Sequence, residues 1–464
     1  MKPEKRKCSS EHYADAGRDR LSEMPDEVIV HILSYMPTVD AVRTMLIRPF
    51  GNLWTLVHIL NFDVNEFLNK MGLDDKWGRY DVRPFCSFVR NALMLHKRPF
   101  IDKFYLCLGY EYEGGRREAG DDITMWLKFA LDKHAKEIFF CDVSYKFTKS
   151  SDFPNFISQS LVTLELWNCS IYPQLQVNLG SLKKLILCEM NMCEEGFSQF
   201  ICGCPSLQEL RIQDPYEIRN LSFSAPNIRK LSLVLMDAEF DDYDDRWLFD
   251  FPNLKSLDLA TSHIPNVIDV SSVRDFYLEN CSYFMDKAEL RKFKIFLKKF
   301  RGTEVFQLSV HASEPFLHSV RHLHLLQMRW KRVVLVLRVF CQSCLLGFYQ
   351  LMRSSKHLEE LIIHTTTELT LLSSVLLSSQ RFQASTGCVM PKLKTITLHG
   401  YAKPWKYQLQ LVEFLLKSAT VLEKMVFVPN KRQLTTKEKL EKLDFVMHVS
   451  SLQRSSPKAR VLFR

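Results

Sequence analysis

A short alternation of apolar and polar positions, of the form Leu-x-Leu, recurs from about residue 101 to the end of the chain. Strict alternation places the apolar residues on one face of an extended segment, so each copy predicts a short, half-buried β-strand. The predicted strands are centred on Tyr105, Phe139, Glu165, Ile186, Arg211, Ser232, Asp258, Tyr277, Gln307, His324, Ile362 and Thr397.

The spacing of these strands indicates how they are assembled. From Leu164 to Phe276 successive copies are 21, 25, 21, 26 and 19 residues apart, which is the range of leucine-rich repeats. A strand and a return segment of this length cannot bury their apolar side alone, whereas stacked units share one continuous core. The pattern therefore predicts a solenoid with a curved parallel sheet. A doubly wound α/β domain is the alternative, but its units are longer and no Gly-rich phosphate loop follows an early strand.

The strand units share two further features. Several carry an apolar residue three positions before the strand, as in Leu182-Lys183-Lys184-Leu185. A proline often precedes that residue, as in Phe251-Pro252-Asn253-Leu254. After residue 276 the repeats become irregular, and residues 341–358 predict a helix before the next strand.

Residues 19–60 follow a helical period instead. Pro25 suits the first position of a helix, where its missing N–H has no helical partner in any case. Asp26 and Glu27 then fall in the first turn, where the helix dipole favours acidic side chains. Pro37 ends this helix, and a second follows. A segment of about forty residues buries too little surface to be stable alone, so it either packs on the rest of the chain or docks another protein.

Residues 19–42 resemble the opening of the F-box in the large plant F-box family. The family motif runs D-R-[LI]-S-x-[LM]-P-[DE]-x-[LIV]-[LIV]-x-x-I-L-S-[FY]-[LM]-P-T-x-D-A-V, and this chain reads DRLSEMPDEVIVHILSYMPTVDAV. The family continues L-S-[KR]-R-W-[KR]-x-L-W. This chain keeps the final Leu and Trp, but departs over Ile47–Gly51, where Pro49 removes a backbone donor.

In that family the F-box docks the small Skp-type adaptor of a cullin–RING ubiquitin ligase. The resemblance therefore implies an adaptor-binding face on the apolar side of these helices. The residues expected in it are Met24, Pro25, Val28, Ile29, Ile32, Leu33, Met36, Pro37, Leu46, Leu53 and Trp54.

The C-terminal region resembles the FBD domain that closes many plant F-box proteins with leucine-rich repeats. Its recognisable core is L-x-L-V-x-[FY]-L-L-x-x-A-x-x-L-E-K-M, and residues 409–425 read LQLVEFLLKSATVLEKM. A helix followed by a strand here would cover the last apolar face of the solenoid.

These patterns together predict an α/β chain with a small all-α F-box, an irregular leucine-rich-repeat solenoid and a C-terminal FBD cap. The expected segments are a disordered tail at 1–18, the F-box at 19–60, a helical connector at 61–100, the solenoid at 101–390 and the cap at 391–464.

Composition narrows the class of partner and compartment. The net charge of +9 is modest for 464 residues, and the basic residues are scattered, so nucleic acid is not expected as a partner. The first twenty residues are polar and no run of 18 apolar residues occurs, so neither an export signal nor a membrane span is expected. Thirteen cysteines then indicate reduced thiols in the nucleus or cytoplasm.

Motifs for catalysis are absent from the sequence. It contains no Walker loop, no G-x-S-x-G elbow, no H-E-x-x-H and no kinase signature. Cys341 and Cys344 lie in an apolar helical segment without a second ligand pair, which favours core packing over zinc. We therefore expect a non-enzyme with no cofactor and no metal site.

The outward positions of the predicted strands are the candidate surface for a protein target. In a strand x-L-x-L-x the x side chains point away from the core, and aromatic and Arg side chains are enriched at interfaces. The candidates are Glu165, Trp167, Arg211, Asp258, Tyr277 and His324. Together with these positions, the resemblance to the plant F-box family implies a substrate receptor of a Skp–cullin–F-box ubiquitin ligase. The alternative is a leucine-rich-repeat scaffold whose degenerate F-box joins no ligase.

Overall fold

The computed structural model describes residues 23–47, 50–72, 82–108, 116–142, 153–171, 173–215, 222–235, 248–261, 270–280, 287–310, 327–337, 342–365, 388–400, 405–429 and 436–464. The chain forms two compact units, Met1–Leu182 and Lys183–Arg464. The predicted tail at 1–18 and the strand predicted at 323–325 lie outside the described residues, and so does Pro49.

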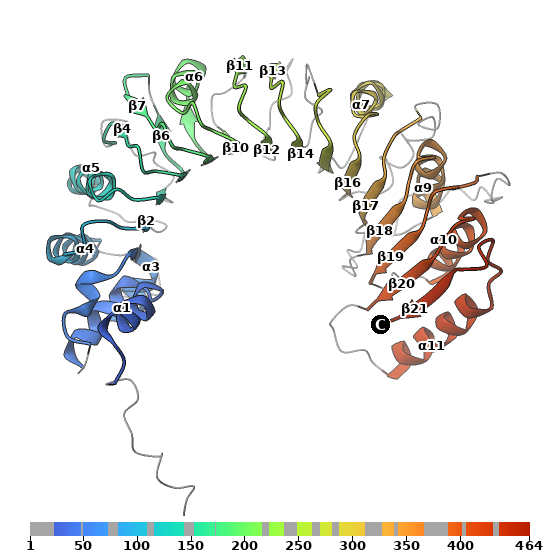
Figure 1. Ribbon diagram of the computed structural model, residues 1–464, viewed down its shortest axis with the longest axis horizontal. Coiled ribbons are helices and arrows are strands. Elements are labelled where there is room, and N and C mark those ends of the chain that lie inside the picture. Colours follow the sequence, from blue (N-terminus) through green and yellow to red (C-terminus); the bar gives the residue numbers. More distant parts are fainter. Residues whose placement is uncertain are drawn as a thin grey trace, which may run out of the picture. The chain divides into compact units, whose positions relative to one another are not determined.

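The first unit begins with helices and continues as a parallel sheet (Figure 1). The opening helical segment comprises α1 (Asp26–Ser34), α2 (Thr38–Arg43) and the 3-10 turns η1 (Thr44–Leu46) and η2 (Leu53–Leu56). Then come β1 (Ile59–Asp63), α3 (Val64–Met71), α4 (Arg83–Leu95), β2 (Lys103–Leu108), α5 (Arg116–Asp132), β3 (Glu137–Asp142) and β5 (Thr163–Trp167). Strands β1, β2, β3 and β5 pair in that order, all parallel. Three short strands, β4 (Phe156–Ile157), β6 (Ser170–Ile171) and β7 (Val177–Asn178), lie in the return segments.

The sheet begins earlier than the sequence pattern predicts. Residues 61–100 were expected to be a helical connector, yet β1 starts at Ile59 and pairs in register with β2. Leu60 and Phe62 of β1 are fully buried, so this strand already belongs to the core. The helices α3 and α4 are then the return segments of the first repeats.

The second unit has the same architecture of parallel strands and return segments. Its strands are β8 (Lys184–Cys188), β9 (Asn191–Met192), β10 (Glu209–Gln213), β11 (Ser222–Ser224), β12 (Lys230–Leu235), β13 (Leu248–Asp250), β14 (Ser256–Thr261), β15 (Asp275–Asn280), β16 (Val305–Val310), β17 (Arg332–Leu337), β18 (Glu360–Thr365), β19 (Thr395–His399), β20 (Lys424–Val428) and β21 (Arg460–Phe463). Its helices are α6 (Glu194–Cys202), α7 (Lys287–Lys299), α9 (Gln342–Ser354), α10 (Trp405–Ser418) and α11 (Thr436–Ser451).

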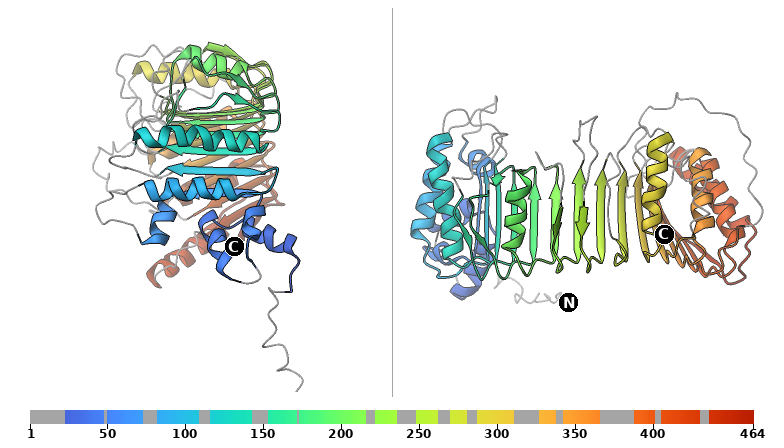
Figure 2. Two further views of the ribbon diagram at one scale, coloured as in Figure 1. Left: turned by 90° about the vertical axis from the view of Figure 1, so that its left-hand side faces the viewer. Right: turned by 90° about the horizontal axis from the view of Figure 1, so that it is seen from above.

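The main sheet of this unit follows the order β8, β10, β12, and then β14 to β21 in sequence, with every pair parallel. Figure 2 (right) shows these strands side by side. Helices α7, α9 and α10 lie together on one face of the sheet (Figure 1).

The core explains the repeated sequence pattern. The inward residues of each strand are buried, for example Leu185 and Leu187 of β8 and Leu257 and Leu259 of β14. The apolar residue three positions upstream is buried as well, as at Leu254. This confirms the prediction of stacked strands around one continuous core.

The recurring Pro-Asn pairs link successive return segments. The side-chain amide of Asn227 donates to the carbonyl of Pro205 at 2.7 Å. The amide of Asn253 likewise donates to the carbonyl of Pro226 at 2.8 Å. Each asparagine thus satisfies a carbonyl of the preceding repeat, which accounts for the residue type after the proline.

One strand lies where the sequence showed only an unbroken apolar run. Residues 332–337 form β17, between β16 and β18. In β17 the outward Val334 is buried along with the inward Val333 and Leu335. Burial on both faces removes the alternation that identified the other strands.

The C-terminal region extends the sheet by three strands. Strand β19 pairs with β20, and β20 with β21. The ring of Phe427 on β20 contacts Phe445 on α11 and Phe463 on β21.

No helix among the described residues is long and apolar enough to cross a membrane.

Candidate functional site

The opening helical segment has one buried and one exposed apolar face. Ile29 and Leu33 of α1 point into the core and are each 1% exposed. Val28 and Ile32 occupy the neighbouring stripe and are each 43% exposed. The exposed stripe continues through Tyr35. A contiguous exposed apolar stripe of this kind is characteristic of an interaction surface.

The residues predicted to bind an adaptor therefore divide into three groups. Pro25, Val28, Ile32 and Leu46 are exposed; Met24, Met36, Pro37 and Leu53 are half-buried; and Ile29, Leu33 and Trp54 are buried. The prediction that the last three form an external face is corrected, because these side chains fill the chain's own core. Docking itself stays a prediction.

Sequence reasoning missed several exposed apolar side chains of the opening helical segment. Tyr35, Met45, Ile47 and Leu56 are exposed large apolar side chains in the same segment. Tyr35 follows Ile32 by three residues, so the helical period could have identified it. Met45, Leu46 and Ile47 lie at the end of a short 3-10 turn, whose geometry the sequence pattern does not reveal.

The helical segment is attached to the first strand of the sheet by side-chain hydrogen bonds. The backbone N–H of His58 donates to Ser34 Oγ at 3.1 Å, and the N–H of Asn61 donates to Thr38 Oγ1 at 2.7 Å. Ser34 and Thr38 are both buried. The segment thus covers the edge at β1 with one face, and the exposed stripe lies outside that contact.

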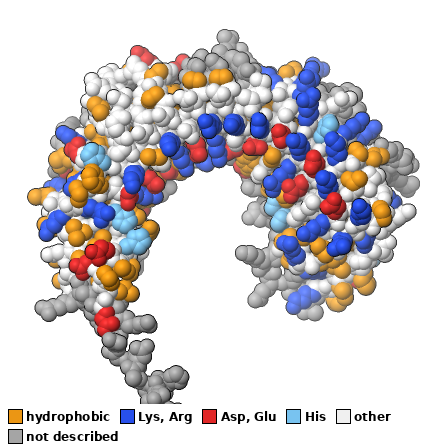
Figure 3. All heavy atoms as spheres, in the orientation of Figure 1, with side chains coloured by type: hydrophobic (Ala, Val, Ile, Leu, Met, Phe, Trp, Pro, Cys, Tyr) orange, Lys and Arg blue, Asp and Glu red, His pale blue; other side chains and the backbone are white. Residues whose placement is uncertain are grey.

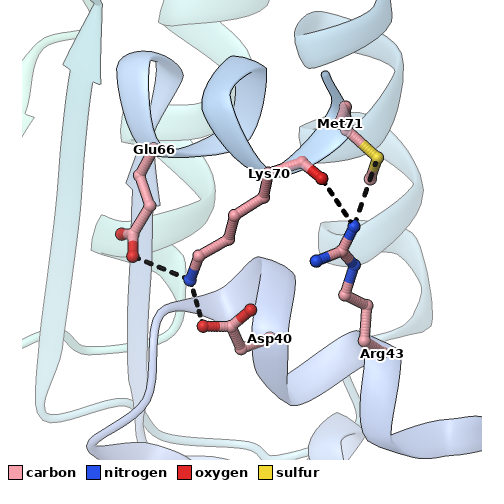
Figure 4. A network of polar contacts seen from close by, with 5 residues as sticks. All are labelled: Asp40, Arg43, Glu66, Lys70 and Met71. Atoms are coloured by element: carbon pink, nitrogen blue, oxygen red, sulfur yellow. Dashed lines mark hydrogen bonds and ion pairs between the residues drawn. The ribbon is translucent and has the colours of Figure 1, made fainter. Parts of the chain in front are cut away.

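A charged network joins α2 to α3 (Figure 4). Lys70 pairs with Asp40 and, at 2.9 Å, with Glu66. Burial opposes the charge on Lys70, but these hydrogen bonds outweigh it and raise the lysine pKa. Arg43 also donates to the carbonyl of Lys70 at 2.8 Å. Both contacts fix α2 against the repeat that follows.

His96 joins the end of α4 to the chain after η2. Its Nε2 donates to the carbonyl of Val57 at 2.9 Å. Its Nδ1 is buried and has no hydrogen-bond partner within the described residues. Burial lowers the pKa of His96, and the nearby charges of Lys133 and Arg98 lower it further, against the opposing effect of the Val57 carbonyl.

We expect this histidine to make the first unit sensitive to acid. The unfolded chain binds the His96 proton more tightly than the folded chain does. Stability is therefore complete above the unfolded pKa of about 6.5 and decreases as the pH falls below it. The melting temperature should drop between about pH 7.5 and about pH 5.5, and drop less in His96→Gln, which keeps a donor but does not titrate. Equal drops in both proteins would contradict this assignment.

Three predicted target-binding residues lie in one cross-strand row of the second unit. Arg211, Ser232, Asp258 and Tyr277 are register neighbours on β10, β12, β14 and β15. Asp258 lies 3.7 Å from Lys230 Nζ, and burial nevertheless raises the pKa of its carboxyl. The hydroxyl of Tyr277 donates to Glu279 at 2.9 Å. These side chains face away from the core, as predicted; binding of a target is a separate hypothesis.

Glu165 and Trp167 belong to the first unit. The indole N–H of Trp167 donates to Glu165 Oε1 at 2.7 Å. Phe139 on β3 is the register neighbour of Glu165. The ring of Phe139 stacks on the ring of Tyr105, with centroids 4.2 Å apart. The sequence placed these two aromatics at outward positions but gave no reason to single them out. His324, the sixth candidate, lies outside the described residues.

The described part of the chain holds no group of three or more His, Cys, Asp or Glu side chains that could bind a metal ion. Its described cysteines are free thiols, and most of them are buried.

Three family models match the chain in separate segments. The F-box domain matches residues 21–47. The model for the LRR repeats of the FBD-associated F-box protein At5g56370 matches residues 123–340. The FBD model matches residues 385–427. None of the three descriptions is that of an enzyme.

Relatives from Arabidopsis thaliana carry the same combination in their names. The F-box/FBD/LRR-repeat protein At5g56420 is 29% identical over 52% of this chain and 55% of its own length. The F-box/FBD/LRR-repeat protein At2g04230 is 29% identical over 55% of each chain. The putative F-box/LRR-repeat protein At5g02930 is 25% identical over 78% of this chain and 75% of its own length. The chain thus spans little more than half the length of the first two. The chain therefore carries segments that match F-box, LRR-repeat and FBD models, and its homologues are Arabidopsis F-box/FBD/LRR-repeat proteins.

Proposed function

We propose that the chain is the substrate-receptor subunit of a Skp–cullin–F-box ubiquitin ligase. The F-box docks a Skp-type adaptor, and the repeats bind a protein target for ubiquitination. Transfer of ubiquitin is carried out by the partner proteins, so the chain itself is not an enzyme. The nucleus or cytoplasm, where thiols stay reduced, is the proposed compartment.

The observation that carries this proposal is the exposed stripe of Val28 and Ile32 on α1 and of Tyr35, which directly follows it. The opposite face of the same helix is already buried against the chain. The exposed side chains are therefore only partly covered by the described part of this unit. Association that buries them would remove apolar surface from water, which favours binding by about 25 cal/mol for each Å².

Co-elution with a Skp-type adaptor tests the proposal. The purified full chain and a recombinant adaptor should elute together from a size-exclusion column as an equimolar complex. Circular dichroism of the chain alone would show that it is folded. A folded chain that elutes without adaptor would instead support the scaffold alternative, in which the F-box joins no ligase.

A further inference from the structure

A row of side chains lies at the start of the strands in the second unit, one residue before each strand begins. Backbone hydrogen bonds link the row: Gln208 donates to Lys183, Arg229 to Gln208, Lys255 to Arg229 and Arg274 to Lys255, at 2.8 to 2.9 Å. We call Lys183, Arg229, Lys255 and Arg274 the basic rim. All four are exposed. Figure 3 shows Lys and Arg side chains in a row, with acidic side chains close beside them.

The charges in this row follow a different pattern further along the sheet. From β15 onward its members alternate in sign: Arg274, Glu304, Lys331, Glu359, Lys394 and Glu423, again linked by backbone hydrogen bonds. Lys331 Nζ lies 3.0 Å from Glu304 Oε2, and this contact and Arg274 lower the pKa of Glu304. Lys331 and Lys394 each have acidic neighbours on both adjacent strands.

In the basic rim, Lys183, Arg229 and Lys255 have no acidic neighbour in this row, whereas Arg274 has Glu304. Within the residues that the structure describes, Lys183, Arg229 and Lys255 form no ion pair. Arg229, Lys255 and Arg274 are on consecutive neighbouring strands, about 4.8 Å apart. Like charges on neighbouring strands destabilise a sheet. The row before β16 to β20 avoids this arrangement of like charges. The stability of the fold therefore gives no reason for the basic rim.

We infer that the basic rim binds an acidic segment of a partner protein. The rim spans the four steps from β8 to β15, or about 19 Å, which about six residues of extended chain would cover. The backbone groups of the rim are already paired with one another, so contacts would come from the Lys and Arg side chains.

The adjoining row favours a peptide over a nucleic acid. Directly beside the rim are Lys184, Glu209, Lys230, Ser256 and Asp275, neighbours in register. Glu209 and Asp275 are exposed and would repel a continuous phosphate backbone. A peptide can place its carboxylates on the rim alone and present neutral or basic side chains to this second row.

Binding of a probe peptide tests the inference. The probe is a fluorescein-labelled peptide of about eight residues, rich in Asp and Glu, titrated into the full chain and followed by fluorescence anisotropy. The double variant Arg229→Gln and Lys255→Gln should bind it at least about fivefold more weakly. Raising the salt concentration should weaken wild-type binding, because exposed charges are screened.

A matched variant separates the rim from net charge. Lys331→Gln with Lys394→Gln removes the same charge from the alternating part of the row, and should leave binding within about twofold of wild type. An equal loss in both variants would overturn the inference. Tighter binding of poly-uridine RNA or of phosphatidylserine vesicles than of the peptide, lost in the rim variant, would also overturn it.

That the acidic segment belongs to a ubiquitination target rests on the proposed function. Adaptor co-elution is therefore measured on the same proteins. Peptide binding without adaptor capture would refute the ligase role and leave the rim assignment standing. Adaptor capture without peptide binding would support the ligase role and refute the rim assignment.

Discussion

Replacing Val28 and Ile32 together by arginine is expected to abolish capture of a Skp-type adaptor by a chain that stays folded. Both side chains are 43% exposed on α1, so arginine can be accommodated in the free chain. In a complex the two guanidinium groups would be buried among apolar side chains without partners, which is strongly unfavourable. Replacing a hot-spot residue at the centre of an interface costs about 2 kcal/mol or more, so affinity should fall at least about a hundredfold. Calorimetric titration of adaptor into the wild-type protein and into the double variant measures this loss of affinity.

Two comparison variants make this result interpretable. Met94 on α4 is 83% exposed in the same unit, and Met94→Arg should bind adaptor like wild type. Leu33→Arg, in contrast, places a charge at a core position and should unfold the helical segment, so its loss of binding carries no information about docking. Undiminished adaptor binding by the Val28→Arg, Ile32→Arg protein would contradict the docking face.

The sequence pattern on α1 predicted one apolar face, and the structure divides it. Val28 and Ile32 are four residues apart and lie on one stripe; Ile29 and Leu33 form a second stripe about 100° further around the helix. Periodicity shows that both stripes are apolar. It cannot show which one the rest of the chain covers, because that depends on where β1 lies, and β1 itself was not predicted.

The repeats were more predictable because their signal is local. Leu164 and Leu166, like Leu231 and Leu233, alternate with polar residues and are buried as expected. The pattern fails where burial is two-sided, as in β17. It also cannot recognise the basic rim, since Lys183 and Arg229 become neighbours of Gln208 only once the strands are in register.

Replacing Trp330 by alanine is expected to produce the largest loss of stability in the second unit. Trp330 precedes β17 and is fully buried. Its ring stacks on Phe306 of β16 with centroids 4.1 Å apart, and its indole N–H donates to the carbonyl of Phe300 at 3.4 Å. Truncating a buried tryptophan leaves a cavity and typically costs about 3–5 kcal/mol.

The architecture determines where this loss should be seen. Each repeat contacts only its neighbours in a solenoid, so the destabilisation should be concentrated around the altered unit. Hydrogen–deuterium exchange should accelerate most in β16, β17 and β18, and should be unchanged in β2 and β3. Trp330→Phe keeps an aromatic ring on Phe306 and loses the N–H bond, worth about 1 kcal/mol, together with part of the ring volume. Its cavity is smaller than that of the alanine variant, so its effect should be clearly smaller. Uniform acceleration across both units, or an alanine variant as stable as the phenylalanine variant, would show that the stacked pair does not hold these repeats together.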